Sequence, residues 1–466
     1  MNQPSALPVL PEGFVWGVST AAYQIEGAVT EDGRGPTSWD AFCAEPGRVL
    51  NGDSGEVACD HYHRYPEDIA LMADLGVDAY RFSFAWSRIQ PTGSGAVNPL
   101  GLDFYDRLVD GLLKAGVTPS PTLFHWDTPL PLEQAGGWLN RDTALRFGEY
   151  AGIVGEHFAD RIPRWITINE PVVLTMLGYG AGIQAPGLRL GFEALPAAHH
   201  LLLGHGLAVR ALRAAGADNI GVANNHAPTW AAGDDPADQQ AAGLYDHISN
   251  WIFADPILTG AYPEAMAGML PDVPAEDLEI ISSPIDWYGI NYYNPTKVAA
   301  PGYSATQGDA DGPALIDGHE LDAGLPFELV DIDGYPRTDF DWPVIPAGLT
   351  ELLVSFRERY GDALPPIYIT ENGAAINDEP DAAGRVTDQR RIDYTDAHLR
   401  AIADAVDAGV DVRGYFHWSL MDNFEWAVGN SMRFGLVHTD FETQTRTPKD
   451  SFHWYRDVIA ANRARS

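Results

Sequence analysis

The sequence predicts an α/β fold, a closed (β/α)8 barrel, because short apolar runs alternate with amphipathic helical patterns along the chain. There are eight such runs, which favours eight strand–helix units closed into a barrel over an open sheet. In chain order they are residues 14–18, 79–84, 118–124, 165–168, 220–223, 287–290, 367–370 and 412–416. A barrel with insertions can exceed ~400 residues. We therefore expect residues 1–466 to form a single catalytic TIM-barrel domain with long active-site loops.

The helical patterns between the runs support parallel strands joined by crossovers. The helix expected before the fourth strand has apolar residues three and four positions apart, which place them on one face. They are Ala144, Phe147, Ala151, Val154 and Phe158. An earlier helix carries Ile69 and Met72 on its apolar face, with Pro66 suited to its first turn and Gly76 to its end.

The stretch 299–341, between the sixth and seventh runs, shows little periodicity and is rich in Gly, Asp and Pro. A long loop inside a compact domain is usually functional or disordered. Because barrels place their active-site loops after the strands, we interpret the stretch as a lip over the site. The alternative is a solvated insertion without a role.

Composition and charge restrict the partners. The chain has 65 Asp and Glu against 29 Lys and Arg, a net charge of −36, which disfavours nucleic acid and anionic membranes. The uncharged run 171–188 is interrupted by glycine and proline, so it is a poor candidate for a membrane span. Cys43 and Cys59 form no CxxC pair, and the first residues lack the pattern of a secretory signal. We expect a soluble, cytoplasmic protein with free thiols.

Two glutamates follow apolar runs directly. Glu170 comes after the fourth run and Glu371 after the seventh. Carboxylates at the C-terminal ends of barrel strands face the mouth of the barrel, and a pair of them is the minimal equipment for glycoside hydrolysis. Each taken alone is also compatible with a solvated glutamate at a strand end.

A series of motifs in a fixed order extends this reading. They are residues 14–17 (FVWG), 21–27 (AAYQIEG), 80–83 (YRFS), 124–127 (FHWD), 167–171 (TINEP), 291–293 (NYY), 369–373 (ITENG) and 423–426 (NFEW). With these motifs the chain resembles glycoside hydrolase family 1, the retaining β-glucosidases, in its bacterial type, over about residues 14–455.

The resemblance implies catalytic roles. Glu170 is the expected acid/base and Glu371 the nucleophile, with their carboxyl groups about 5–5.5 Å apart and with separated pKa values. Arg81 and Tyr293 match the partners of the nucleophile, and Asn291 joins the catalytic set. A purely structural alternative for Arg81 is a pair with another acid of the barrel floor.

The resemblance also implies a sugar site. Substrate-binding residues expected on this basis are Gln24, His125, Trp126, Asn169, Trp342, Trp418, Glu425, Trp426 and Phe434. Trp418 is expected to stack under the sugar ring, and Trp342 to form a platform on the aglycone side or, alternatively, a hydrophobic plug. The 14 histidines form no HExxH pattern or ligand cluster, so no metal and no cofactor is expected.

The sugar itself is only partly determined. Relatives that act on 6-phospho-glycosides carry Ser, Lys and Tyr where this chain has Glu425, Met432 and Phe434, so a non-phosphorylated β-glucoside is expected as the small-molecule substrate. On the basis of the resemblance we expect a retaining β-glucosidase that hydrolyses cellobiose, short cello-oligosaccharides or aryl and alkyl β-glucosides, with broader activity on galactosides and fucosides as the alternative. A transglycosylase and a non-catalytic sugar-binding relative remain alternatives to hydrolysis, and the sequence does not predict the oligomeric state. Asn430 departs from the family pattern near the sugar rim.

Overall fold

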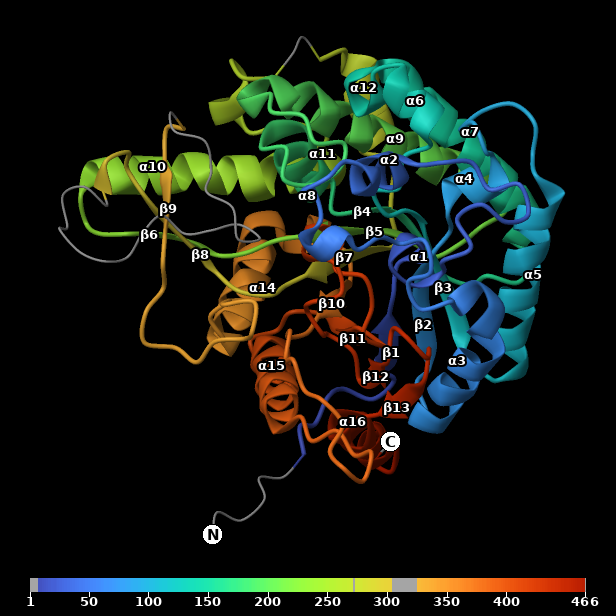
Figure 1. The fold of residues 1–466 in the computed structure, drawn as a ribbon. Coiled ribbons are helices and arrows are strands. Elements are labelled where there is room, and N and C mark those ends of the chain that lie inside the picture. Colours follow the sequence, from blue (N-terminus) through green and yellow to red (C-terminus); the bar gives the residue numbers. More distant parts are fainter. Residues whose placement is uncertain (1–6, 271–272, 304–324, 466) are drawn as a thin grey trace.

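A computed structural model describes residues 7–270, 273–303 and 325–465, and its centre is a closed barrel of eight parallel strands (Figure 1). Around the barrel the strands follow one another in chain order. They are β1 (Val15–Ser19), β2 (Ala79–Ser83), β3 (Thr118–Phe124), β4 (Trp165–Asn169), β5 (Ile220–Asn225), β7 (Trp287–Asn291), β10 (Ile367–Asn372) and β11 (Val412–Trp418). The predicted (β/α)8 barrel is confirmed.

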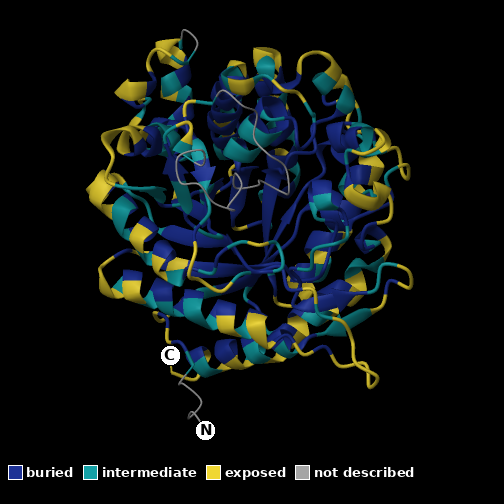
Figure 2. Cartoon of the chain, turned by 60° about the vertical axis from the view of Figure 1, so that its left-hand side comes forward, coloured by how far each residue is buried: buried dark blue, intermediate teal, exposed yellow. Residues whose placement is uncertain are grey.

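Helices surround the strands, and in Figure 2 the half-exposed helices enclose the buried barrel. The long ones are α3 (His61–Leu75), α5 (Pro99–Lys114), α7 (Arg141–Phe158), α9 (Leu195–Ala214), α14 (Pro346–Tyr360), α15 (Gln389–Asp407) and α16 (Asp450–Arg463). Shorter ones are α1 (Ala22–Ile25), α2 (Ser38–Ala44), α4 (Trp86–Ile89), α6 (Leu130–Gln134), α8 (Pro171–Val173), α10 (Pro236–Asp246), α11 (Ile252–Thr259) and α12 (Ala275–Ile281). Single turns and π-helical segments are η1 (Leu50–Gly52), η2 (Gly137–Leu139), η3 (Leu174–Gly180), η4 (Gly191–Ala194), η5 (His247–Trp251), η6 (Glu264–Met266), η7 (Gly361–Ala363) and η8 (Trp426–Val428).

The predicted start of the helix α3 was wrong. Pro66 lies inside α3, five residues after His61, and not in the first turn. The residues before it, His61 to Tyr65, are polar and aromatic and show no apolar period, so the sequence gives no sign that they are helical. The other end is as predicted: Gly76 caps α3 with φ +77°, a conformation that favours glycine.

The stretch expected to be an irregular lip contains regular structure. β9 (Glu328–Val330) pairs with β8 (Thr296–Ala299), which pairs with β6 (Thr229–Ala231) in a small sheet beside the barrel. The stretch also provides Phe327 and Phe340 to the wall of the cavity described below, while residues 304–324 lie outside the described part. Three-residue strands are too short to leave a periodic signal. A second small sheet pairs β12 (Val437–Thr439) with β13 (Arg446–Pro448).

The barrel interior is filled by side chains. A Cβ atom at Gly17 would lie 2.2 Å from the ring of Phe416, so the glycine makes room for that ring. Cys43 and Cys59 are free thiols, as expected. Within residues 7–270, 273–303 and 325–465 the structure has no helix that is both long and apolar enough for a membrane span.

Candidate active site

The chain bends sharply where β4 ends, and this bend carries Glu170. The residue has φ +43°, a left-handed conformation that is strained for a side chain other than glycine, and Pro171 begins α8 directly after it. The N–H of Glu170 donates to the carbonyl of Ala223 on β5 at 2.8 Å, which anchors the bend to the barrel. Backbone strain of this kind is concentrated at functional sites.

Glu371 is held differently, because it lies within β10 and not after it. The pairing of β10 with β7 shifts register between Ile369 and Glu371. Such irregularities re-aim side chains next to active sites. Glu170 and Glu371 are each 3 % exposed and line the same cavity.

A cation and a phenol bind the carboxylate of Glu371. Arg81 Nη1 donates to its Oε1 at 2.5 Å, and the Tyr293 hydroxyl donates to its Oε2 at 2.7 Å. Burial and the neighbouring Glu371 raise the pKa of Tyr293 well above its usual value, so the phenol keeps its proton and acts as a donor. The partner of the buried Arg81 is therefore Glu371, and the alternative of a floor acid is not needed.

In the part of the chain that the structure describes, amides and no cation hydrogen-bond to the side chain of Glu170. Asn291 Nδ2 donates to its Oε1 at 2.6 Å and Asn225 Nδ2 at 3.2 Å. Burial, followed by the charge of Glu371, raises the pKa of Glu170 to about 8. This side chain is thus protonated at neutral pH, while Glu371 has a fixed positive partner. The surroundings of Glu170 therefore suit a proton donor, and those of Glu371 suit a charged carboxylate.

Asn169 connects the two carboxyl groups through a buried network. Its Oδ1 accepts from Arg81 Nη2 at 2.6 Å and from Asn291 Nδ2 at 3.0 Å, and its Nδ2 donates to His125 Nε2 at 2.9 Å. Burial and then Arg81 lower the pKa of His125 well below its usual value, so the ring is neutral. One N–H of Asn169 is left for the predicted contact with a sugar hydroxyl.

The cavity has a volume of about 800 Å³, large for a small-molecule site. Predicted residues that line it are Glu170, Glu371, His125, Trp126, Tyr293, Trp342, Trp418, Glu425, Trp426 and Phe434. The other predicted residues, Gln24, Arg81, Asn169 and Asn291, are fully buried behind this lining. Gln24 Nε2 contacts Glu425 Oε2 at 3.3 Å, while its Oε1 has no partner among the described residues.

Aromatic rings line the part of the cavity that holds Glu170 and Glu371, which we call the deep end. His125 stacks on Trp418 with ring centroids 5.9 Å apart, and Trp126 packs on Trp426 at 4.7 Å. Phe434 was expected to bind substrate, and it lies in an apolar cluster with Trp418 and Trp342. A site that combines a flat apolar surface with buried polar groups suits a sugar ring.

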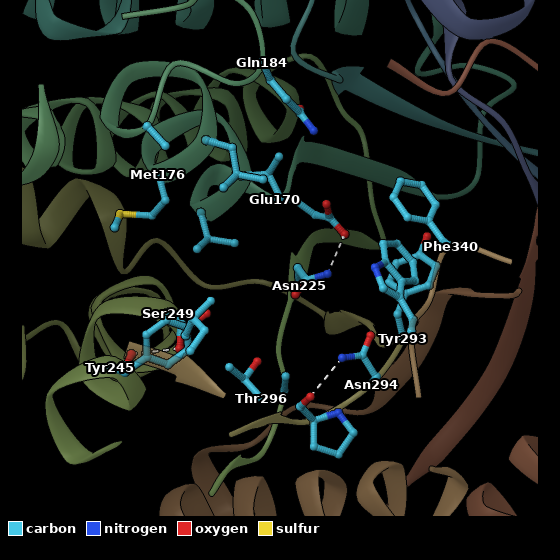
Figure 3. A pocket seen from close by; sticks show the side chains of 18 of the residues that line it. Glu170, Met176, Gln184, Asn225, Tyr245, Ser249, Tyr293, Asn294, Thr296 and Phe340 are labelled. Carbon is cyan, nitrogen blue, oxygen red and sulfur yellow. Dashed lines mark hydrogen bonds between the residues drawn. The ribbon is translucent and has the colours of Figure 1, made fainter. Parts of the chain in front are cut away.

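Sequence reasoning missed several lining residues. Asn225 ends β5, two residues beyond the predicted strand (Figure 3). Its position at the carboxyl end of a barrel strand was the available signal. An aliphatic wall was also missed, because it comes from α8, η3 and η4, for which no periodicity was identified. We call it the aliphatic wall: Val172, Val173, Met176, Leu177 and Phe192.

Asn430, the departure noted near the sugar rim, joins two loops. Its backbone N–H donates to Asp53 Oδ2 at 2.9 Å, and a Cβ at the preceding Gly429 would lie 2.5 Å from the same oxygen. Asn430 does not belong to the described lining of the cavity. No group of His, Cys, Asp and Glu suited to a metal ion occurs among the described residues.

A (β/α)8 barrel with two carboxyl groups in one cavity, one protonated and one paired with arginine, defines a hydrolase of the glycosidase type. Comparison with known proteins agrees, because the profile of glycosyl hydrolase family 1 matches residues 7–464. The chain belongs to glycosyl hydrolase family 1 and is a glycoside hydrolase.

Named relatives share nearly the full length. A thermostable β-glucosidase B of Thermobispora bispora is 47% identical and aligns over 98% of this chain and 92% of its own. β-Glucosidase A of Thermotoga maritima is 43% identical over 97% of this chain and 98% of its own.

Solved structures are equally similar. A psychrophilic β-glucosidase of Micrococcus antarcticus superposes with a TM-score of 0.92 at 44% identity, covering 97% of this chain and 98% of its own. The β-glucosidase of Thermotoga maritima in complex with deoxynojirimycin gives 0.89 at 42% identity, covering 98% of this chain and 99% of its own.

Proposed function

We propose that the protein is a retaining β-glucosidase that removes terminal non-reducing β-D-glucosyl residues by double displacement. The observation that carries this proposal is the asymmetry of the carboxyl pair: Glu371 binds Arg81 and Tyr293, whereas Glu170 is buried, with its pKa raised to about 8. One group is thus prepared as nucleophile and the other as acid. The relatives named as β-glucosidases support the choice of sugar.

In the first step Glu371 attacks the anomeric carbon while Glu170 gives its proton to the leaving oxygen. The bond to the aglycone breaks, and a covalent glucosyl–Glu371 ester forms. In the second step Glu170, now a carboxylate, takes a proton from water, which attacks the anomeric carbon and releases glucose and Glu371. The expected separation of about 5–5.5 Å between the carboxyl groups is part of this proposal.

The sugar ring would occupy the deep end of the cavity. Trp418 offers a face for its C–H groups, while the buried Gln24 and the half-buried Glu425 offer polar atoms for its hydroxyls. A phosphate placed beside Glu425 would meet a like charge, which supports a non-phosphorylated sugar.

The aglycone would extend along the aliphatic wall. Val172, Val173, Met176 and Leu177 line the cavity without offering hydrogen bonds from their side chains. Such a surface suits aryl and alkyl glucosides, and the cavity volume of about 800 Å³ also leaves room for cellobiose and short cello-oligosaccharides, intermediates of cellulose degradation. The same wall can accept an alcohol in place of water, so some transglycosylation is included in the proposal. The two free thiols support a reducing, cytoplasmic location.

The Glu371→Ala variant tests the mechanism. Hydrolysis of 4-nitrophenyl β-glucoside should fall by more than about 10⁴-fold, because no nucleophile remains. Added azide should then form an α-glucosyl azide. Glu351→Ala, an exposed carboxylate on α14, is the matched control and should keep its activity. Undiminished hydrolysis by Glu371→Ala would rule out the proposed mechanism.

A further inference from the structure

Both amide donors on Glu170 converge on one oxygen. Asn291 Nδ2 lies 2.6 Å and Asn225 Nδ2 3.2 Å from Oε1. Among the described residues no hydrogen bond reaches Oε2. In Figure 3 one carboxyl oxygen is joined to Asn225, and the other is turned away from it. The two oxygens of this acid are therefore not equivalent.

The direction of the Asn291 amide is set by Arg81. A guanidinium can only donate, so the Asn169 atom 2.6 Å from Arg81 Nη2 must be the carbonyl oxygen. The Asn291 atom 3.0 Å from that same oxygen must then be the NH₂ group. The Thr370 hydroxyl, which donates to Asn291 Oδ1 at 2.6 Å, fits the same orientation. Because Arg81 can only donate, the orientations of the Asn169 and Asn291 amides are both fixed, and Asn291 presents its NH₂ group to Glu170.

An oxygen that accepts two N–H bonds is the carbonyl oxygen of a neutral carboxyl group, because its lone pairs are used by the donors. We propose that Asn225 and Asn291 keep the proton of Glu170 on Oε2, the oxygen that no hydrogen bond from the described residues reaches, and that Asn225 is a positioning residue of the acid. The inference rests on the proposed role of Glu170 as acid/base. Because Glu170 lines the cavity, a proton on Oε2 is available to a leaving oxygen, whereas a proton on Oε1 would face the amides.

The arrangement also serves the second step. When Glu170 is a carboxylate, the two amides still bind Oε1, and Oε2 remains the base that takes the proton from water. The proton therefore leaves from and returns to the same atom, and the side chain does not have to rotate between the steps.

Leaving-group dependence tests this inference. Phenyl β-glucoside needs a proton on its leaving oxygen, and 2,4-dinitrophenyl β-glucoside does not. Asn225→Ala should lower kcat/KM about tenfold for the phenyl substrate and less than about twofold for the dinitrophenyl substrate. The amide favours the charged form of Glu170, so its loss should also move the alkaline limb of the phenyl pH profile to higher pH.

Asn225→Asp provides the matched variant. It keeps the shape of the side chain but presents acceptors to Oε1, which draws the proton to the wrong oxygen. Proton placement therefore predicts that Asp lowers kcat/KM for the phenyl substrate more than Ala does, while a packing role predicts that Asp is better tolerated. Asn294→Ala, whose amide donates to the Pro295 carbonyl at 2.9 Å and not to Glu170, should leave the ratio of the two substrates unchanged.

Glu170→Ala separates the two possible failures. If Glu170→Ala lowers kcat/KM equally for both substrates, Glu170 is not the acid, and the proposed function fails at that residue. Two other outcomes would overturn the placement of the proton and leave the acid role in place. In the first, Glu170→Ala lowers kcat/KM mainly for the phenyl substrate while Asn225→Ala lowers it equally for both. In the second, Asn225→Asp retains more activity on the phenyl substrate than Asn225→Ala.

Discussion

The two ends of the cavity differ in how they are built. At the deep end, Arg81, Asn169 and Glu371 lie on barrel strands, fully or almost fully buried, and Arg81 hydrogen-bonds both of the other side chains. At the outer end, the aliphatic wall comes from short helical segments after β4, and its side chains are half-buried. The difference teaches that the carboxyl pair is fixed by the barrel sheet, whereas in the proposed function the aglycone meets apolar contacts from segments outside the sheet.

After loss of the nucleophile itself, the largest expected effect comes from removing the cation of the deep end. Arg81→Met leaves the buried Glu371 without its positive partner and Asn169 Oδ1 without one of its two donors. We expect kcat/KM for 4-nitrophenyl β-glucoside to fall by about 10³-fold, since electrostatic contacts in buried sites contribute strongly to catalysis. Arg81→Lys, which keeps the charge but not both contacts, should lose less. Equal losses in the two variants would mean that geometry outweighs charge.

Titration of Glu170 gives the next largest effect. Its pKa is raised to about 8, so kcat/KM for phenyl β-glucoside should fall about tenfold per pH unit above pH 8 as the acid loses its proton. A profile without this alkaline limb would contradict the assignment of the acid.

The same shift affects stability. A carboxyl group with a raised folded pKa binds a proton that the unfolded chain releases above about pH 4.3, so its contribution is complete below that pH and is lost as the pH rises through 8. Glu170→Gln carries no such charge. Its Tm should exceed that of the unaltered protein by more at pH 8.5 than at pH 5, as measured by calorimetry.

A smaller effect is expected at the outer end. Met176→Thr makes the aliphatic wall more polar and should reduce kcat/KM for octyl β-glucoside about three- to tenfold, because roughly two methylene-sized groups of apolar contact are lost. Cellobiose, which offers hydroxyls, should be affected less. If kcat/KM falls equally for both substrates, the aliphatic wall supports the fold and does not determine the choice of aglycone.

The smallest effect concerns neither end. A net charge of −36 implies self-repulsion that salt screens, so moderate NaCl should raise Tm by a few degrees. The buried contacts of the deep end should be insensitive to it, and kcat/KM for 4-nitrophenyl β-glucoside should stay within about twofold. A constant Tm would show that self-repulsion does not govern stability.

The sequence predicts the barrel well because each strand has an apolar core. It places several strand ends too early, since β4, β5, β7 and β10 continue into Asn169, Asn225, Asn291 and Asn372. These polar residues break the apolar run at the positions where barrel strands carry function. The family motifs recovered three of these four asparagines within their ranges. Asn225 belonged to no recognised motif; its strand-end position was the only sequence signal, and its contact with Glu170 appears only in three dimensions.

Because Glu371 lies inside β10 and Glu170 is anchored to β5, the proposed reaction machinery is held by elements other than those that carry the aliphatic wall. For protein engineering, this means that the catalytic residues and the segments of the aliphatic wall can be altered separately. Segments that carry the aliphatic wall can be exchanged with those of a homologue while the hydrogen bonds of the carboxyl pair stay in place.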